Sequence, residues 1–150
     1  MAIARGAGTE IIRTVHVDDL DSAGRIFIFG EQHHIYTVLS VIVFPFAIQA
    51  AGNWCSMTMQ AKDALGGTTN ADIGIFKQEM QLNQTFVWND KFSFNGHEPN
   101  SSYAGPMDTV AKQNLIVDQD SSTSQKLYLA TQNAADNFHV HITYIDQNNS

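Results

Sequence analysis

The longest apolar run, IYTVLSVIVFPFAIQAA at residues 35–51, and the strand HHIYTVLSVIVFPFAI predicted over residues 33–48 limit what this chain can fold into. Apolar side chains occupy both alternating sets of positions along this strand, which is typical of a strand buried between layers of structure. A membrane-spanning helix needs about 20 predominantly apolar residues, and this segment is shorter, contains polar residues and holds Pro45. We therefore expect a long buried strand and no membrane partner. Pro45 is expected to mark a bend or the strand's end, because proline has no N–H for a strand ladder.

The other apolar segments are short, rich in β-branched and aromatic residues, and separated by turn-forming residues, as in all-β domains. The predicted strands cover residues 10–17, 25–30, 33–48, 54–62, 73–82, 85–94, 115–117, 125–132 and 138–145, with a turn at residues 18–24. In the fourth of these, Cys55, Met57, Met59 and Ala61 are predicted to point inward. No helical periodicity and no internal repeat is present, so the expected fold is all-β, a single antiparallel β-sandwich of the jelly-roll kind.

The chain has 150 residues, which fits one domain. Residues 1–10 are too poor in apolar side chains to fold alone, so they form an arm that is either frayed or ordered against a neighbouring subunit. Residues 11–150 form the sandwich. Turn-forming residues dominate a long inserted loop at about residues 95–124, and such loops commonly carry contacts with partners.

Charged residues make up only 15% of the chain, against about 25% in an average soluble domain. A surface of neutral polar groups suits a protein that packs against other proteins. The net charge of −7 and the absence of a Lys/Arg run argue against nucleic-acid binding. Cys55 is the only cysteine, so an intrachain disulfide is excluded, and a buried apolar role is expected for it. The N-terminus lacks the apolar region of a signal peptide, which predicts synthesis in the cytoplasm.

The strand near the C-terminus carries two histidines, His139 and His141. Alternation places them on the face opposite to Phe138, Val140, Ile142 and Tyr144, which are predicted to enter the core. A metal site would need a third or fourth ligand, for which His16, His33, His34 and His97 are candidates. We interpret the pair instead as surface or subunit-interface histidines. If they lie at an interface, their protonation would weaken assembly in mild acid.

The chain contains no nucleophile elbow, phosphate-binding loop, H-E-x-x-H or C-x-x-C motif. The acidic loops at residues 18–21 and 118–124 do not match a calcium-binding EF-hand, and we interpret them as turns. Their oxygen ligands also suit a structural Ca²⁺, an alternative that the sequence leaves open. Asp72, Glu79 and Asp90 are available as a carboxylate pair, but their spacing in space cannot be read from sequence. Trp54, Trp88 and Tyr103 are interpreted as core or interface anchors rather than sugar-stacking residues. We expect no enzymatic activity and no cofactor.

Three segments together resemble a family. Residues 33–59, HHIYTVLSVIVFPFAIQAAGNWCSMTM, read as a strand, a small-residue turn and a second strand. TFVWNDKFSF resembles an x-L-V-L-D-D-K-L-V-L hairpin, and QKLYLATQNAADNFHVHITYID resembles a D-K-L-Y-V-x-A-S-x-A-x-x-V-x-V-T-V-S-Y-I-E ending. This ordered set is similar to small β-sandwich structural proteins of tailed bacteriophages, of the capsid decoration (cement) type. Here residues 95–124 are inserted between the second and third segments.

The resemblance implies a virion protein that binds the head shell through the major capsid protein or another virion protein, as a homotrimer. Candidate partner contacts lie in the arm, in the insertion and on the last strand: Ile3, Arg5, Glu10, His97, Tyr103, Met107, His139 and His141. One alternative is a tail, neck or fibre component that recognises a host-surface glycan through the insertion and Tyr103. A second is a metal-dependent jelly-roll enzyme that uses His139 and His141.

Overall fold

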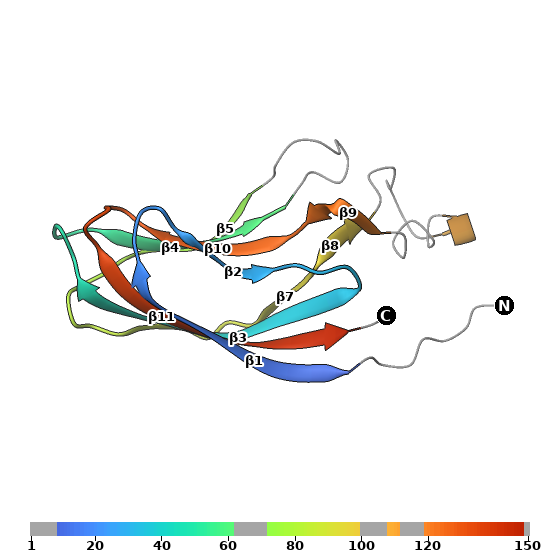
Figure 1. The fold of residues 1–150 in the computed structure, drawn as a ribbon, viewed down its shortest axis with the longest axis horizontal. Coiled ribbons are helices and arrows are strands. Elements are labelled where there is room, and N and C mark those ends of the chain that lie inside the picture. Colours follow the sequence, from blue (N-terminus) through green and yellow to red (C-terminus); the bar gives the residue numbers. More distant parts are fainter. Residues whose placement is uncertain (1–8, 62–71, 100–107, 112–118, 149–150) are drawn as a thin grey trace.

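The computed structural model describes residues 9–61, 72–99, 108–111 and 119–148. The strands form two antiparallel sheets that face each other, with a two-stranded ribbon at one end (Figure 1). The all-β antiparallel sandwich is therefore confirmed. Among the described residues, none of the helices has the length and apolar character needed to cross a membrane.

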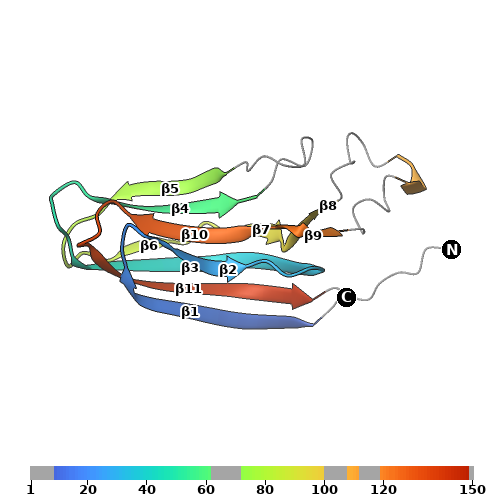
Figure 2. The same ribbon diagram turned by 45° about the horizontal axis from the view of Figure 1, so that its top comes forward.

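The first sheet has the order β1, β11, β3, β6, with β7 also paired to β3. Its strands are β1 (Glu10–Leu20), β11 (Asn137–Asn148), β3 (His34–Ala47), β6 (Phe86–Trp88) and β7 (Phe92–Asn95). The second sheet has the order β2, β10, β4, β5. Its strands are β2 (Arg25–Phe29), β10 (Lys126–Thr131), β4 (Trp54–Gln60) and β5 (Ile73–Glu79). The chain crosses repeatedly between the sheets, as in a jelly roll (Figure 2).

Strict alternation along β4 and β11 builds the core. In β4, Cys55, Met57 and Met59 are buried as predicted, whereas Ala61 lies just beyond the strand and is half-buried. The predicted inward set of β11 is also confirmed for Phe138, Val140 and Ile142, all fully buried, while Tyr144 is half-buried. These side chains meet Leu127 and Leu129 of β10 in one continuous apolar cluster.

The prediction that β3 is buried on both faces is wrong. Its inward side chains are buried, but on the other face Ile42 and Phe46 are exposed, because no third layer covers this sheet in the part of the chain that is described. A register shift opposite Thr143 and Tyr144 changes which residues of β3 point inward. Pro45 neither ends nor leaves the strand. It lies opposite Phe138 at a second irregularity of the ladder, where its missing N–H is tolerated.

Two predicted boundaries change for reasons of pairing. The turn expected at residues 18–24 begins later, because β1 continues until Leu20 pairs with Phe138. Gly24, with φ of 71°, closes the turn by donating its N–H to the Asp21 carbonyl at 3.1 Å. The segment expected as one strand at residues 85–94, with a hairpin-like sequence, is not a hairpin. It forms β6 and β7, which pair in succession with the same strand, β3.

The inserted segment leaves the sandwich through a ribbon of β8 (His97–Pro99) and β9 (Gln119–Ser124). Gly96 anchors this ribbon, since its N–H donates to the His34 carbonyl at 2.7 Å and its carbonyl accepts from the Gln125 N–H at 2.8 Å. The strand predicted at residues 115–117 lies outside the described residues. At the other boundary, the predicted arm ends one residue inside β1, because Glu10 already pairs with Gln147.

Candidate functional site

The outward side chains of β1, β11, β3 and β6 form a surface that we call the histidine face. It comprises the outward residues of the first sheet between its two ends: Ile12, Thr14, His16, Thr37, Ser40, Ile42, Phe44, Phe46, Val87, His139, His141, Thr143 and Ile145. None of these side chains is a carboxylate, a lysine or an arginine, and the carboxylates of the same face of β1, Glu10 and Asp18, lie at its two ends. In a chain with a net charge of −7, a neutral patch of this width needs a physical explanation.

One cross-strand row runs through the centre of the histidine face. His16 of β1 is opposite His141 of β11, His141 is opposite Ile42 of β3, and Ile42 is opposite Val87 of β6. The rings of His16 and His141 lie 5.7 Å apart between centroids. Ile42 is 38% exposed and Val87 is 53% exposed. The row therefore offers two titratable rings beside two apolar side chains, all accessible from solvent.

A second aromatic group lies beside this row, toward the end of β3. The His139 ring stacks on Phe46, with centroids 5.1 Å apart and planes 12° apart, and it also contacts Phe44. Phe46 is 59% exposed, and Ile12 at the opposite end of the histidine face is 69% exposed. Exposed apolar side chains grouped in this way, with polar groups between them, are typical of protein–protein contact surfaces.

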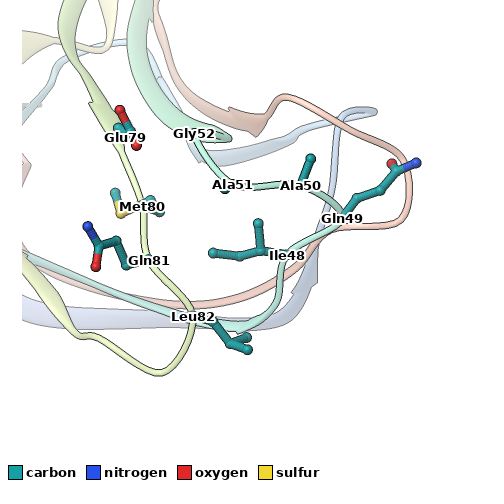
Figure 3. Close-up of a pocket in the computed structure, with 9 residues that line it drawn as sticks. All are labelled: Ile48, Gln49, Ala50, Ala51, Gly52, Glu79, Met80, Gln81 and Leu82. Atoms are coloured by element: carbon teal, nitrogen blue, oxygen red, sulfur yellow. The ribbon is translucent and has the colours of Figure 1, made fainter.

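A pocket of about 390 Å³ opens at the end of the sandwich where β3 finishes. It lies between the β3–β4 and β5–β6 connections and is lined by Ile48, Gln49, Ala50, Ala51, Gly52, Glu79, Met80, Gln81 and Leu82 (Figure 3). Ile48 extends across the gap between the two connections, whereas Leu82 is 53% exposed. The walls carry one carboxylate, Glu79, and are otherwise neutral, so the pocket suits an apolar side chain of a partner.

Buried hydrogen bonds hold this end of the molecule in place. Asp136 is buried, and its Oδ1 accepts from the Gln49 N–H at 2.9 Å and from Asn53 Nδ2 at 2.8 Å. Its Oδ2 accepts from the Asn133 N–H at 3.0 Å. The Met80 N–H donates to the Asn53 carbonyl at 2.8 Å. Three connections are thereby fixed to one another, which pre-forms the pocket instead of leaving it to induced fit.

A polar cluster lies at the opposite end of the sandwich. Asp146 Oδ1 lies 2.6 Å from His34 Nδ1, and its Oδ2 accepts from Arg13 Nε at 2.9 Å. Glu31 Oε2 lies 3.5 Å from His34 Nε2. Burial raises the pKa of Tyr36 to about 12, an effect that the hydrogen bond from the Glu31 N–H partly offsets. Among the described residues, His34 has no serine, threonine or cysteine partner, so this His–Asp pair ties β1, β3 and β11 together without an attached nucleophile.

The predicted contact residues are dispersed in the structure. His139 and His141 lie on the histidine face, Glu10 is exposed at the start of β1, and His97 is buried in β8. Ile3, Arg5, Tyr103 and Met107 lie outside the described residues. For the metal hypothesis, His16 does meet His141, but across the described ranges no group of three or more His, Cys, Asp or Glu side chains could hold a metal ion.

Sequence reasoning named His16 only as one of four possible metal ligands, and it missed Ile42, Phe46 and Val87 as members of the same surface as His139 and His141. The outward position of Ile42 and Phe46 was concealed by the apolar character of β3 on both faces. The meeting of His16 with His141 depends on the pairing of β1 with β11, which joins opposite ends of the chain. Pattern alone does not specify that pairing or its register.

No protein-family model and no curated protein matches the sequence. Among solved structures, a Bacillus endospore appendage protein that forms disulfide-linked pili is 13% identical over 100% of this chain and 97% of that chain, with a TM-score of 0.43. A VP2 subviral particle of infectious bursal disease virus is 8% identical over 99% of this chain and 34% of that chain, with a TM-score of 0.48. A chain of the Gx strain of the same virus is 7% identical over 95% and 33%, with a TM-score of 0.49.

This chain thus spans about a third of the length of the bursal disease virus chains that it matches. At identities of 7–13%, the likeness concerns the β-sandwich architecture alone.

Proposed function

We propose that this chain is a non-enzymatic structural protein of a virus particle. In this proposal it is a capsid decoration protein of a tailed bacteriophage, made in the host cytoplasm and seated on the outer surface of the head shell. Its partners are the major capsid protein or another virion protein, together with further copies of itself in a trimer. The assignment to a tailed bacteriophage rests on the resemblance of three sequence segments. The proposed way of binding to the shell rests on the histidine face.

The observation that carries the proposal is a broad, neutral, partly apolar sheet face on an acidic protein. Like charges repel across a contact, and an unpaired charge buried there costs several kcal/mol. A face whose centre carries neither carboxylates nor ammonium groups, and whose β1 carboxylates Glu10 and Asp18 lie at its ends, reduces both penalties. Three strands about 4.8 Å apart, each contributing about eight residues at 3.3 Å, together with the three residues of β6, give a footprint of roughly 400 Å². That footprint is of the same order as the roughly 800 Å² per partner of a specific protein complex.

The remaining contacts are assigned to the arm and the insertion, which contain Ile3, Arg5, Tyr103 and Met107. The arm leads into β1, and the insertion leaves the sandwich through the β8–β9 ribbon, at the same end of the molecule (Figure 1). A symmetric oligomer that seats several copies at once multiplies weak individual contacts. Tight attachment to a shell therefore does not require high affinity in any single contact.

The test is to add the purified chain to shells of its own phage from which it has been removed, and to measure co-sedimentation and heat stability. Wild-type protein is expected to bind and to raise the temperature at which the shells open. Val87→Lys, on the histidine face, is expected to abolish binding. Ile73→Lys is the matched control, since Ile73 is equally β-branched and exposed but lies on β5 of the second sheet. Absence of wild-type binding, or equal loss in both variants, contradicts the proposal.

A further inference from the structure

A groove of about 460 Å³ crosses the outer face of the second sheet, on the side of the molecule away from the histidine face. It is lined by Trp54, Ser56, Thr58, Gly74, Ile75, Phe76 and Lys77. Ser56 and Thr58 point outward because their neighbours Cys55, Met57 and Met59 fill the core. The groove exists because Gly74, paired with Thr58, has no side chain, and an added Cβ there would meet nothing within 4 Å.

The walls of the groove combine an aromatic ring with unused polar groups. Trp54 is half-buried, and Lys77 Nζ lies 4.2 Å from the centroid of its ring. Within the described residues, the hydroxyls of Ser56 and Thr58 make no hydrogen bond to protein. Lys77 is exposed, and among the residues that the structure describes its ammonium group forms no ion pair. Because lysine is long and flexible, its ammonium can move aside and still donate to a molecule placed on the indole.

We propose that this groove binds a saccharide. A pyranose ring has an apolar C–H face that packs on an indole, and a rim of hydroxyls that both donate and accept hydrogen bonds. Trp54 supplies the apolar wall, Ser56 and Thr58 supply donor–acceptor groups, and Lys77 supplies further donors. Small-molecule sites are of this kind, with an apolar surface and a few placed polar groups in a volume of about 300–1,000 Å³. The site lies on rigid strands and differs from the insertion and Tyr103 named for glycan contact in the sequence analysis. It gives Trp54 a sugar-stacking role in place of the anchor role expected from sequence.

Gly74 makes the inference sharply testable. Its φ lies outside the left-handed range and its Cβ direction is open, so Gly74→Gln is expected to fold normally while filling the groove. The full chain is labelled and applied to a panel of immobilised neutral and acidic oligosaccharides. Wild-type protein is expected to bind at least one member, and Gly74→Gln and Trp54→Ala are expected to weaken that binding at least tenfold. Far-UV circular dichroism and the thermal midpoint establish that both variants are folded.

Val87→Gln on the histidine face is the control and is expected to bind saccharides as the wild type does. The inference is overturned if the wild type binds no member of the panel, or if Gly74→Gln binds as well as the wild type does. Shell binding is measured in parallel with the same variants. Gly74→Gln is expected to leave it unchanged, so that failure of the saccharide site is distinguished from failure of the proposed assembly function.

Discussion

His16 and His141 lie directly opposite each other on β1 and β11, with ring centroids 5.7 Å apart. The outward residues that flank this pair on β11 and β3 carry no charge, whereas on β1 an exposed carboxylate, Asp18, follows two residues after His16 on the same face. When both rings are protonated, two like charges at this separation repel each other, and a partner that covers them must also dehydrate them.

Assembly through the histidine face is therefore expected to weaken in mild acid. As the pH is lowered from 8 to 5, the fraction of chain bound to shells should fall, and the double variant His16→Gln, His141→Gln should lose most of this dependence. Co-sedimentation at each pH provides the measurement, with thermal midpoints as a check on folding. Unchanged wild-type binding over the whole range would remove the histidine pair from the contact.

The two faces of β11 are expected to respond very differently to substitution. Ile142 is fully buried, so Ile142→Asp should prevent folding by placing an unpaired charge in the core. His141 points outward, so His141→Ala should change the free energy of unfolding by no more than about 0.5 kcal/mol. Urea denaturation followed by circular dichroism distinguishes the two. Similar damage from both substitutions would mean that the strand's faces are assigned wrongly.

Gly96 and Gly74 make a matched pair for a steric prediction. A Cβ added at Gly96 would lie 1.8 Å from the Glu31 carbonyl oxygen, whereas one added at Gly74 would meet nothing within 4 Å. Gly96→Ala is expected to destabilise the fold by about 1–3 kcal/mol or more, because backbone must move to relieve the overlap. Gly74→Ala should be close to neutral. Equal midpoints of urea unfolding for the two variants would contradict this account of the ribbon junction.

The buried thiol of Cys55 is expected to make the free energy of unfolding fall at alkaline pH. Burial raises the pKa of its thiol to about 12, and the nearby Asp136 carboxylate adds to the shift. The unfolded chain releases this proton near the ordinary value of 9.0, so the free energy of unfolding should be unaffected below about pH 9 and should fall above it. The slope is about 1.4 kcal/mol per pH unit until the folded-state value is reached. Burial of Tyr36 adds a similar loss from about pH 10 upward.

Urea midpoints measured between pH 8 and pH 10.5 test this linkage. Cys55→Ala lowers stability at every pH by leaving a cavity, so the comparison concerns the slope and not the absolute value. The variant should show a shallower decline than the wild type above pH 9. Parallel declines in the two proteins would show that Cys55 does not contribute.

Alternation was enough to predict much of the fold from sequence. β4 and β11 follow the period of two without interruption, so their inward residues could be named. β3 could not be oriented in this way, because it is apolar at both sets of positions and its ladder shifts register twice. The sequence of β6 and β7 looked like a hairpin because TFVWNDKFSF resembles the x-L-V-L-D-D-K-L-V-L pattern, yet β3 is long enough to pair with both strands in succession.

The candidate surface was predictable only in part. The outward position of His139 and His141 could be predicted from the alternation of their own strand. The other residues of the same surface come from β1, β3 and β6. The groove at Gly74 depends on an irregularity in the pairing of β4 with β5, and no sequence pattern predicts that irregularity. Register across strands that are distant in sequence is a tertiary property, and it decides both surfaces.

The position of β11 between β1 and β3 has a consequence for biosynthesis. A ribosome makes β11 after all the strands with which it pairs, so β1 and β3 emerge with unpaired edges and wait for a partner. The first sheet therefore closes only after β11 has been made. Pairings of such long sequence separation form slowly and leave apolar edges open meanwhile. Rapid high-level expression should consequently favour aggregation, and slower synthesis at lower temperature should favour soluble protein.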